Sequence, residues 1–270
     1  VSTRHPLWVA CWQNEEGGTW GSHLVTTEPT TAELATVARS GKSISDGIRY
    51  IGGDPARLAS ARLRKGDAHG YLELHIEQGG NLDRDKLDIG VVEGIVGLRE
   101  WDVTIMGVAN HAGTTPMAER HDAMLAAARF TEMVNRVATS EPGRQVGTVG
   151  RIQAFPGAPN VVPGKVVCTL ELRDLDDAKI QRLYDVIVAE SHKIGARNGT
   201  TFDYHEFVTH ESALCDERVR SLIGASARTL GFTTMSLPSG AGHDAQNLAR
   251  VCPMGMIFIP SVGGISHAPK

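Results

Sequence analysis

The stretch LELHIEQG, residues 72–79, predicts a β-strand that runs into a polar loop. Its apolar residues alternate with Glu73, His75 and Glu77, so one face is apolar and the other carries two acids and an imidazole. Three ionisable groups on one face of a buried strand are costly unless a partner compensates their charge. Neutral imidazole and carboxylate suit zinc or manganese, so a metal ion is one such partner. A strand end open to water is the alternative.

The composition bounds the class of protein. The chain has 270 residues, 41% hydrophobic and 21% charged, with a formal net charge of -4. These values are typical of a globular protein of one large or two ordinary domains, and they favour neither a nucleic-acid nor a membrane partner. The start of the chain shows no signal-peptide pattern. The cysteines form no CxxC pair, which predicts buried thiols in a reducing, cytoplasmic compartment.

A second apolar run, LWVACW at residues 7–12, predicts a buried parallel strand that ends at two adjacent acids, Glu15 and Glu16. Sites in open α/β sheets gather at the carboxyl ends of strands. Adjacent residues of an extended chain point in opposite directions, so one carboxylate could bind a metal while its neighbour takes a proton from bound water. A solvated acidic turn is the alternative. His23, in the Gly- and Thr-rich stretch that follows, is interpreted as a loop histidine.

The middle of the chain predicts an inserted domain. Composition shifts at Gly97, and residues 97–208 follow the order strand, helix, strand, strand, helix, strand, with helices over residues 122–137 and 177–194. This β-α-β-β-α-β order is the ferredoxin-like pattern. The sequence therefore predicts a catalytic domain made of residues 1–96 and 209–270, interrupted by an inserted domain at residues 97–208.

Polar loops recur after the predicted strands. They are NEEG at residues 14–17, HIEQG at 75–79, SGAGHD at 239–244 and GGISH at 263–267. The inserted domain adds NHAGTTP, residues 110–116, between its first strand and first helix. A single histidine in such a loop is more often structural than functional. Five such loops, mostly at strand ends, favour a catalytic or metal site.

Several strings, in this order, resemble one enzyme family: NEEG, ELHIEQG, GIVG, ANHAGTTPM, GAPNVVPG, LELRD, SGAGHDA and GISHAP. The family is the zinc-dependent amidohydrolases of the hydantoinase/carbamoylase type. It includes N-carbamoyl-L-amino-acid hydrolases, β-ureidopropionases and allantoate amidohydrolases, within the superfamily of dinuclear-metal aminoacylases and carboxypeptidases. The resemblance implies an α/β fold: a mixed-sheet catalytic domain like that of metallo-exopeptidases, with the inserted ferredoxin-like (βαββαβ) unit as the dimerisation or lid domain.

The resemblance also implies a metal centre. Two divalent ions, zinc or else manganese or cobalt, would have Glu16, His75 and His267 among their ligands. Glu15 would be the general base that takes a proton from the metal-bound water.

Substrate-binding residues are implied in the same way. Gln78, Asn160 and Arg173 would hold the substrate, and the Arg fork matches a carboxylate in two hydrogen bonds. His111 would reach into the site of a neighbouring subunit and stabilise the oxyanion. His243 would line the substrate pocket.

The sequence also departs from the family pattern. The GSHxD string and the bridging Asp of the family do not precede Glu15, so we expect an N-terminal segment with two metal ligands to be absent and the dinuclear site to assemble poorly. GGTW at residues 17–20 stands where the family has an Arg-aromatic pair, so substrate contacts there are left open. The chain ends at Lys270, where the family continues with an acidic residue and a helix.

The leading prediction is a cytoplasmic, metal-dependent amidohydrolase that cleaves the carbamoyl C–N bond of an N-carbamoyl-L-amino acid, giving an amino acid, carbon dioxide and ammonia. Its partners would be a ureido substrate with a carboxylate and a second copy of the chain, bound through the inserted domain. Allantoate amidohydrolase and β-ureidopropionase are the alternative activities. A catalytically incomplete, dimer-forming relative is the alternative of another class. A sheet edge left free by an absent segment would make the chain poorly soluble.

Overall fold

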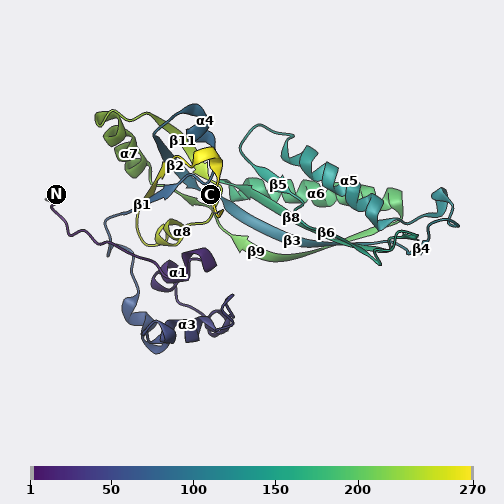
Figure 1. Cartoon of the computed structure of the whole chain (residues 1–270), viewed down its shortest axis with the longest axis horizontal. Coiled ribbons are helices and arrows are strands. Elements are labelled where there is room, and N and C mark those ends of the chain that lie inside the picture. The colour runs from purple at the N-terminus through teal and green to yellow at the C-terminus, as the bar shows by residue number, and fades with distance from the viewer. Residues whose placement is uncertain (1–2, 269–270) are drawn as a thin grey trace. The chain divides into compact units, whose positions relative to one another are not determined.

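The computed structural model describes residues 3–268, which divide into two compact units (Figure 1). Unit 1 combines Val1–Ile95 with Leu214–Lys270, and unit 2 is Val96–Ala213. The sequence-based division placed these boundaries after residues 96 and 208. In the described part of the chain, no helix has the length and apolar character needed to cross a membrane.

Unit 1 is built on a mixed five-stranded sheet in the order β1-β12-β2-β10, with β11 also pairing with β2. β1 is parallel to β12 and β11 is parallel to β2, whereas β12 and β2 are antiparallel. Among the described residues β1 pairs only with β12, so it is an edge strand. The strands are β1 (Tyr71–Ile76), β2 (Ile89–Ile95), β10 (Ala213–Leu214), β11 (Thr234–Ser239) and β12 (Met254–Ile259).

The polar face of β1 is the one that points into unit 1. Leu72, Leu74 and Ile76 are 56%, 65% and 38% exposed, whereas Glu73 and His75 are half-buried on the opposite face. The backbone N–H of Ala245, in the short helix α8, donates to Glu73 Oε2 at 2.9 Å, so this helix lies against the polar face. The alternation predicted from the sequence is therefore present, and it directs ionisable groups inward.

Helices α7 and α8 pack against this sheet, and α1 packs against α8. The α-helices are α1 (Trp20–Thr26), α2 (Thr31–Ala35), α3 (Ile44–Tyr50), α4 (Asn81–Asp85), α7 (Glu217–Thr229) and α8 (Asp244–Leu248). The 3-10 turns are η1 (Glu15–Gly17), η2 (Pro55–Ala61) and η4 (Val262–Gly264). Thr30 and Glu33 form a capping box at the start of α2.

Two local predictions for the start of the chain are wrong. Residues 7–12 form no strand, and Leu7, Trp8 and Val9 are 74%, 70% and 93% exposed. A strand needs a hydrogen-bonded neighbour and a covered face, and among residues 3–268 this segment has neither. His23 lies in α1 and not in a loop, because α1 buries Ser22 and Leu24. Tertiary packing of this kind overrides weak helix propensity.

Unit 2 is an antiparallel sheet in the order β5-β8-β3-β9, with β6 also pairing with β8. The strand expected directly after the first helix of this unit is split into β5 and β6. The elements are β3 (Gly97–Met106), α5 (Ala123–Ala138), β5 (Val146–Thr148), β6 (Ile152–Phe155), β8 (Lys165–Asp174), α6 (Asp177–Asn198) and β9 (Thr201–His210). A small ribbon pairs β4 (Asn110–His111) with β7 (Val161–Val162), and η3 (Met117–Glu119) precedes α5.

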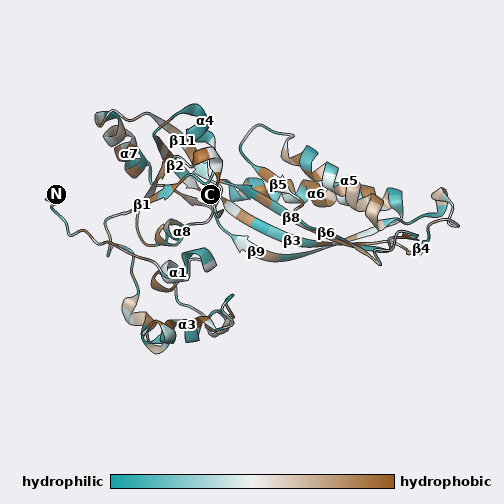
Figure 2. Cartoon of the chain, in the orientation of Figure 1, coloured by the Kyte–Doolittle hydropathy of each residue, from teal (hydrophilic) through white to brown (hydrophobic). Residues whose placement is uncertain are grey.

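The core of unit 2 lies between its sheet and the helices α5 and α6 (Figure 1). Buried residues of α5 recur three and four positions apart, from Ala123 through Phe130 to Val137, which is the apolar stripe of an amphipathic helix. Figure 2 shows the resulting mixture of apolar and polar residues along both helices. Trp101 of β3 stacks on Tyr184 of α6 at 4.4 Å between ring centroids. Unit 2 therefore has a hydrophobic core of its own.

The start of α5 depends on one cap, which gives a first testable prediction. Asp122 Oδ1 accepts hydrogen bonds from the backbone N–H groups of Met124 at 2.8 Å and Leu125 at 3.1 Å. Asp122→Ala removes both acceptors and should lower the free energy of unfolding of unit 2 by about 1 kcal/mol. Asp122→Asn keeps an acceptor oxygen and should cost less. Urea unfolding of the wild type and the two variants measures these stabilities. Equal stabilities would contradict the role of Asp122 as a helix cap.

Candidate metal centre

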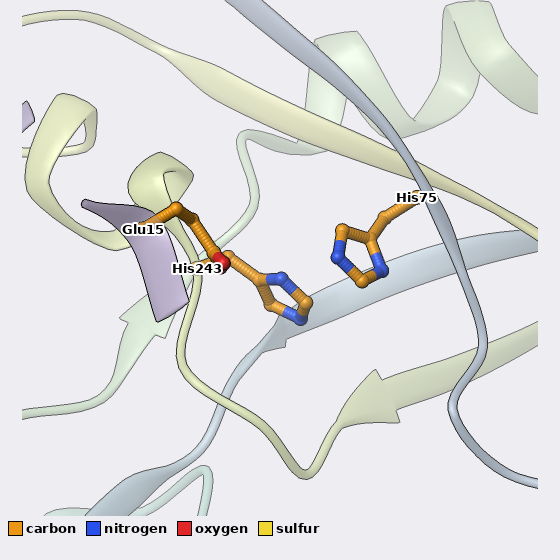
Figure 3. Close-up of side chains that lie close together, drawn as sticks. All are labelled: Glu15, His75 and His243. Atoms are coloured by element: carbon orange, nitrogen blue, oxygen red, sulfur yellow. The ribbon is translucent and has the colours of Figure 1, made fainter. Parts of the chain in front are cut away.

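Three side chains from distant parts of the chain meet in unit 1: Glu15 from η1, His75 from β1 and His243 from the loop before α8 (Figure 3). Each offers one ligand atom, and these atoms lie within 4.8 Å of one another. The two imidazole rings meet edge to face with their centroids 4.5 Å apart. Both rings also pack beside Phe258 of β12, at 6.3 Å for His75 and 5.9 Å for His243. The site is thus formed over β1 and β12.

The hydrogen bonding of His75 leaves one ring nitrogen bare. His75 Nδ1 lies 2.8 Å from the backbone carbonyl oxygen of Ile76. A carbonyl oxygen only accepts, so Nδ1 carries the proton and the neutral ring has a lone pair at Nε2. Histidines that bind metals hold their other nitrogen in this way. His75 is therefore in the tautomer that a cation requires.

His243 is buried and neutral. It is 1% exposed, and its burial lowers its pKa to about 3. Nε2 lies 2.7 Å from Ser239 Oγ, whereas Nδ1 has no hydrogen-bond partner among residues 3–268. Glu73 Oε1 lies 3.6 Å from this nitrogen. A buried ring nitrogen without a partner is unfavourable, and coordination of a cation would satisfy it.

Carboxylates near these rings lack a cationic partner. Burial is the largest cause that raises the pKa of Glu15, of Glu73 and of Asp244, and Glu16 and Asp244 raise that of Glu15 further. In the described part of the chain, neither Lys nor Arg forms an ion pair with any of these three acids. A divalent cation would compensate this negative charge. Two neutral imidazoles and a carboxylate form a donor set that suits zinc.

Two networks hold this site in place. Ser22 Oγ donates to Asp244 Oδ1 at 2.5 Å and accepts from Asn247 Nδ2 at 2.9 Å, which ties α1 to α8. Glu73 Oε2 accepts from the Tyr71 hydroxyl at 3.0 Å as well as from Ala245. The sequence showed Glu73 on the polar strand face. The pairing of Ser22 with Asp244 has no local signal, because 222 positions separate them.

The other predicted ligands of this unit form a second, exposed group. His267 Nδ1 lies 3.6 Å from Glu16 Oε2, and His267 Nε2 lies 3.1 Å from Gln78 Nε2. Gln78 and His267 line a cavity of about 410 Å³. Both residues have left-handed backbone, with φ of 57° and 56°, a strained conformation that concentrates at functional sites. The structure thus groups His75 with Glu15 and His243, and Glu16 with His267.

The remaining predicted residues lie in unit 2. His111 and Asn160 are exposed and adjacent, because Ala112 N–H donates to the carbonyl oxygen of Asn160 at 2.9 Å. Gly113 N–H donates to His111 Nδ1 at 3.0 Å, so a neutral His111 carries its proton on Nε2. Arg173 donates through Nε and Nη2 to both oxygens of Glu171, at 2.8 and 2.9 Å. A substrate carboxylate would have to share this guanidinium with Glu171.

A mixed α/β fold that gathers imidazoles and carboxylates without a cationic partner is typical of metal-dependent hydrolases. The chain belongs to Peptidase family M20/M25/M40, which matches residues 1–270. It is 35% identical over 274 residues to the N-carbamoyl-L-amino acid amidohydrolase of Geobacillus stearothermophilus, covering 100% of this chain and 67% of that protein. It is 36% identical over 204 residues to the allantoate amidohydrolase of Bacillus subtilis, covering 76% of this chain and 50% of that protein.

Solved structures agree with this family. A hydantoinase/carbamoylase amidase from Burkholderia multivorans matches with a TM-score of 0.77 and 33% identity, covering 87% of this chain and 56% of that one. The family resemblance and the fold class predicted from the sequence are thereby confirmed. The chain spans about two thirds of the length of the Geobacillus stearothermophilus relative and 56% of the Burkholderia multivorans structure.

Burial of His243 predicts a pH dependence of stability. Its pKa is about 3 in the folded chain and about 6.5 when exposed, so below pH 6.5 the unfolded chain binds more protons. The free energy of unfolding should therefore fall as the pH drops from 6.5 towards 3, by up to about 1.4 kcal/mol per pH unit. Urea unfolding of metal-free protein at pH 7 and at pH 5 measures this fall in the free energy of unfolding. The fall should be smaller for His243→Gln than for the wild type. Equal losses of stability in the wild type and in His243→Gln would refute His243 as the cause of the pH dependence. The control is His69→Gln, because His69 is exposed.

Proposed function

We propose that the chain carries the machinery of a metal-dependent amidohydrolase that cleaves the carbamoyl C–N bond of an N-carbamoyl-L-amino acid. The observation that carries this proposal is the buried, unpartnered nitrogen of His243 beside His75 and acids that have no cationic partner. The names of the relatives support ureido compounds as the substrate class. Allantoate is the second candidate, because its amidohydrolase is equally similar over the matched residues.

The residues take separate roles in this proposal. His75 belongs to the group with Glu15 and His243 and also to the ligand set that the family resemblance implies. In that set, Glu16 and His267 complete the binding site for zinc, manganese or cobalt. A bound divalent ion polarises the carbamoyl carbonyl and lowers the pKa of water. Glu15 accepts a proton from the attacking water and returns it to the leaving nitrogen. Its raised pKa suits a general base at neutral pH.

Substrate binding is proposed for the other predicted residues. Gln78, in unit 1, and Asn160 and Arg173, in unit 2, hold the ureido group and the carboxylate, and His243 lines the pocket. His111 offers an exposed Nε2–H, the kind of donor that a developing oxyanion needs. We place this donor in the site of a second subunit, in a homodimer formed through unit 2. Sedimentation analysis of the chain tests the dimer, and a monomer at assay concentration contradicts it.

A cytoplasmic location completes the proposal. All four cysteines are free thiols. Burial raises the pKa of Cys168 to about 12 and that of Cys215 to about 11, so these thiols are unreactive at neutral pH. Free, unreactive thiols are the usual state in a reducing compartment.

The test uses the 270-residue chain, stripped of metal and then supplied with zinc, manganese or cobalt. Metal content is measured by plasma mass spectrometry, and ammonia release is measured with N-carbamoyl-L-amino acids and with allantoate. Cation binding with release from the first substrates supports the proposal, and faster release from allantoate selects the second candidate. A chain that neither binds a cation nor hydrolyses either substrate is the non-catalytic relative.

Glu15→Gln separates the two roles open to this carboxylate. If Glu15 is the general base, the variant should keep its metal content and lose hydrolysis, because a base does not hold the cation. Loss of the metal would make Glu15 a ligand.

A further inference from the structure

We propose that Glu77 is a positioning residue that holds the loop after β1 against the loop after β12, and so keeps Gln78 beside His267. The proposal rests on the roles proposed above for Gln78 and His267, and deepens them. Glu77 follows β1 directly and is 8% exposed, so its carboxylate is buried. The sequence places it on the polar face with Glu73 and His75, yet the proposed metal set and proton transfers do not use it.

The carboxylate of Glu77 holds the start of helix α4. Oε1 accepts from the backbone N–H of Asn81 at 2.8 Å and from Asn81 Nδ2 at 2.7 Å, and Oε2 accepts from the backbone N–H of Leu82 at 2.8 Å. The first N–H groups of a helix have no partner within the helix, and the N-cap residue of α4, Gly80, has no side chain to supply one. Glu77 therefore caps α4, and both of its carboxylate oxygens are occupied by this work.

Helix α4 in turn holds the loop that carries His267. It lies against η4, where that loop begins. Asp83 Oδ2, in α4, accepts from the backbone N–H of Gly263 at 3.0 Å. A Cβ at Gly264 would lie 2.9 Å from the backbone nitrogen of Gly80, so the two backbones touch with no side chain between them. Because packed backbones leave no slack, a displacement of α4 displaces η4 as well.

A second connection joins the two loops at Gln78. The backbone N–H of Glu77 donates to the carbonyl oxygen of Ile259, the last residue of β12, at 2.9 Å. The backbone N–H of Gln78 donates to Oγ of the buried Ser261 at 3.0 Å. Gln78 has a φ of 57°, a conformation that persists only where the surroundings determine it. Its Nε2 lies 3.1 Å from His267 Nε2. Glu77 is thus fixed at its backbone and at its carboxylate, and it fixes the point from which Gln78 reaches His267.

The experiment uses NMR of the metal-free 270-residue chain. It measures backbone amide exchange and the nuclear Overhauser effect between the Gln78 side-chain amide and the His267 ring. Glu77→Ala removes both acceptor oxygens, so the amides of Leu82 and Gly263 should exchange about 10-fold faster and the Overhauser effect should be lost. Glu77→Gln keeps one acceptor oxygen and should give intermediate values. Zinc affinity, measured by chelator competition, should fall by about 10- to 100-fold in Glu77→Ala.

The matched control is Asp216→Ala, which removes a carboxylate cap from another helix of the same unit. Asp216 Oδ1 accepts from the backbone N–H of Val219, in α7, at 3.0 Å. This variant should speed amide exchange at Val219. It should leave the Gln78–His267 Overhauser effect and the zinc affinity unchanged, because a general loss of stability in unit 1 does not separate the two loops.

The outcomes separate a positioning residue from a simple helix cap. Faster exchange at Leu82 with an unchanged Gln78–His267 Overhauser effect overturns the proposal, because Glu77 then only caps α4. If Glu77→Ala does not fold, Asp83→Ala tests the same link with the Glu77 contacts in place. Asp83→Ala should speed exchange at Gly263 and weaken the Overhauser effect, and an unchanged effect overturns the proposal.

Failure of the proposed function gives a different result. If the wild-type chain binds no zinc, the proposed metal centre fails. Amide exchange and the Overhauser effect are measured without metal, so they still decide whether Glu77 holds the two loops together.

Discussion

Replacing His75 with Ala should lower the affinity of this chain for zinc by more than about 100-fold. Even the loss of a residue that only supports a metal ligand costs 10- to 100-fold, and His75 is proposed to be a ligand itself. Its Nε2 is bare because Nδ1 donates to the Ile76 carbonyl oxygen. It is also the residue shared by the Glu15–His243 group and by the ligand set that the family resemblance implies. Its loss therefore weakens either arrangement.

The matched control for His75 is His69→Ala. His69 is an exposed histidine of the same unit, and its ring stacks on that of His5 at 5.5 Å. Zinc affinity is measured by chelator competition, with circular dichroism to verify folding. His69→Ala should bind zinc like the wild type. A folded His75→Ala protein with wild-type affinity would remove His75 from the site and leave the exposed pair of Glu16 and His267 as the remaining candidate.

Local patterns predicted unit 2 better than the start of unit 1. The sequence predicts a helix over residues 122–137, and α5 covers Ala123–Ala138 with an apolar stripe and Asp122 as its cap. Both signals lie within the helix itself. The run at residues 7–12 has the composition of a strand, but strand formation depends on a neighbour that composition does not supply. Helix α1 was missed for the converse reason, since its stability comes from packing against α8.

The same distinction applies to the candidate site. His75 and the two acids of the NEEG loop could be singled out because ionisable groups in an apolar setting are a local signal. His243 was expected to line the substrate pocket, and its unpartnered Nδ1 emerges only from its burial. Ser22 and Asp244 gave no signal of their pairing, because 222 positions separate them in the sequence. Proton positions on the rings depend on three-dimensional partners and have no sequence pattern.

Phe130→Ala should have the largest effect on folding, lowering the free energy of unfolding of unit 2 by about 3–5 kcal/mol. Phe130 is fully buried at the centre of α5, and its ring packs against Phe202 and Tyr204 of β9 at 5.7 and 6.4 Å. Domains of this size are stable by only about 5–15 kcal/mol, so the cavity would remove much of that stability. Leu125→Ala, on the same helix but 43% exposed, should cost far less. Urea unfolding followed by circular dichroism measures both.

The two substitutions of this Discussion should act on different units. Unit 2 has its own core of buried residues, and Glu15, His75 and His243 all belong to unit 1. Phe130→Ala should therefore unfold unit 2 at lower urea concentration while zinc affinity stays unchanged. His75→Ala should do the reverse, because unit 2 does not contain the site. Loss of zinc binding in Phe130→Ala, at a urea concentration where unit 1 of the wild type is folded, would show that the two units do not fold independently.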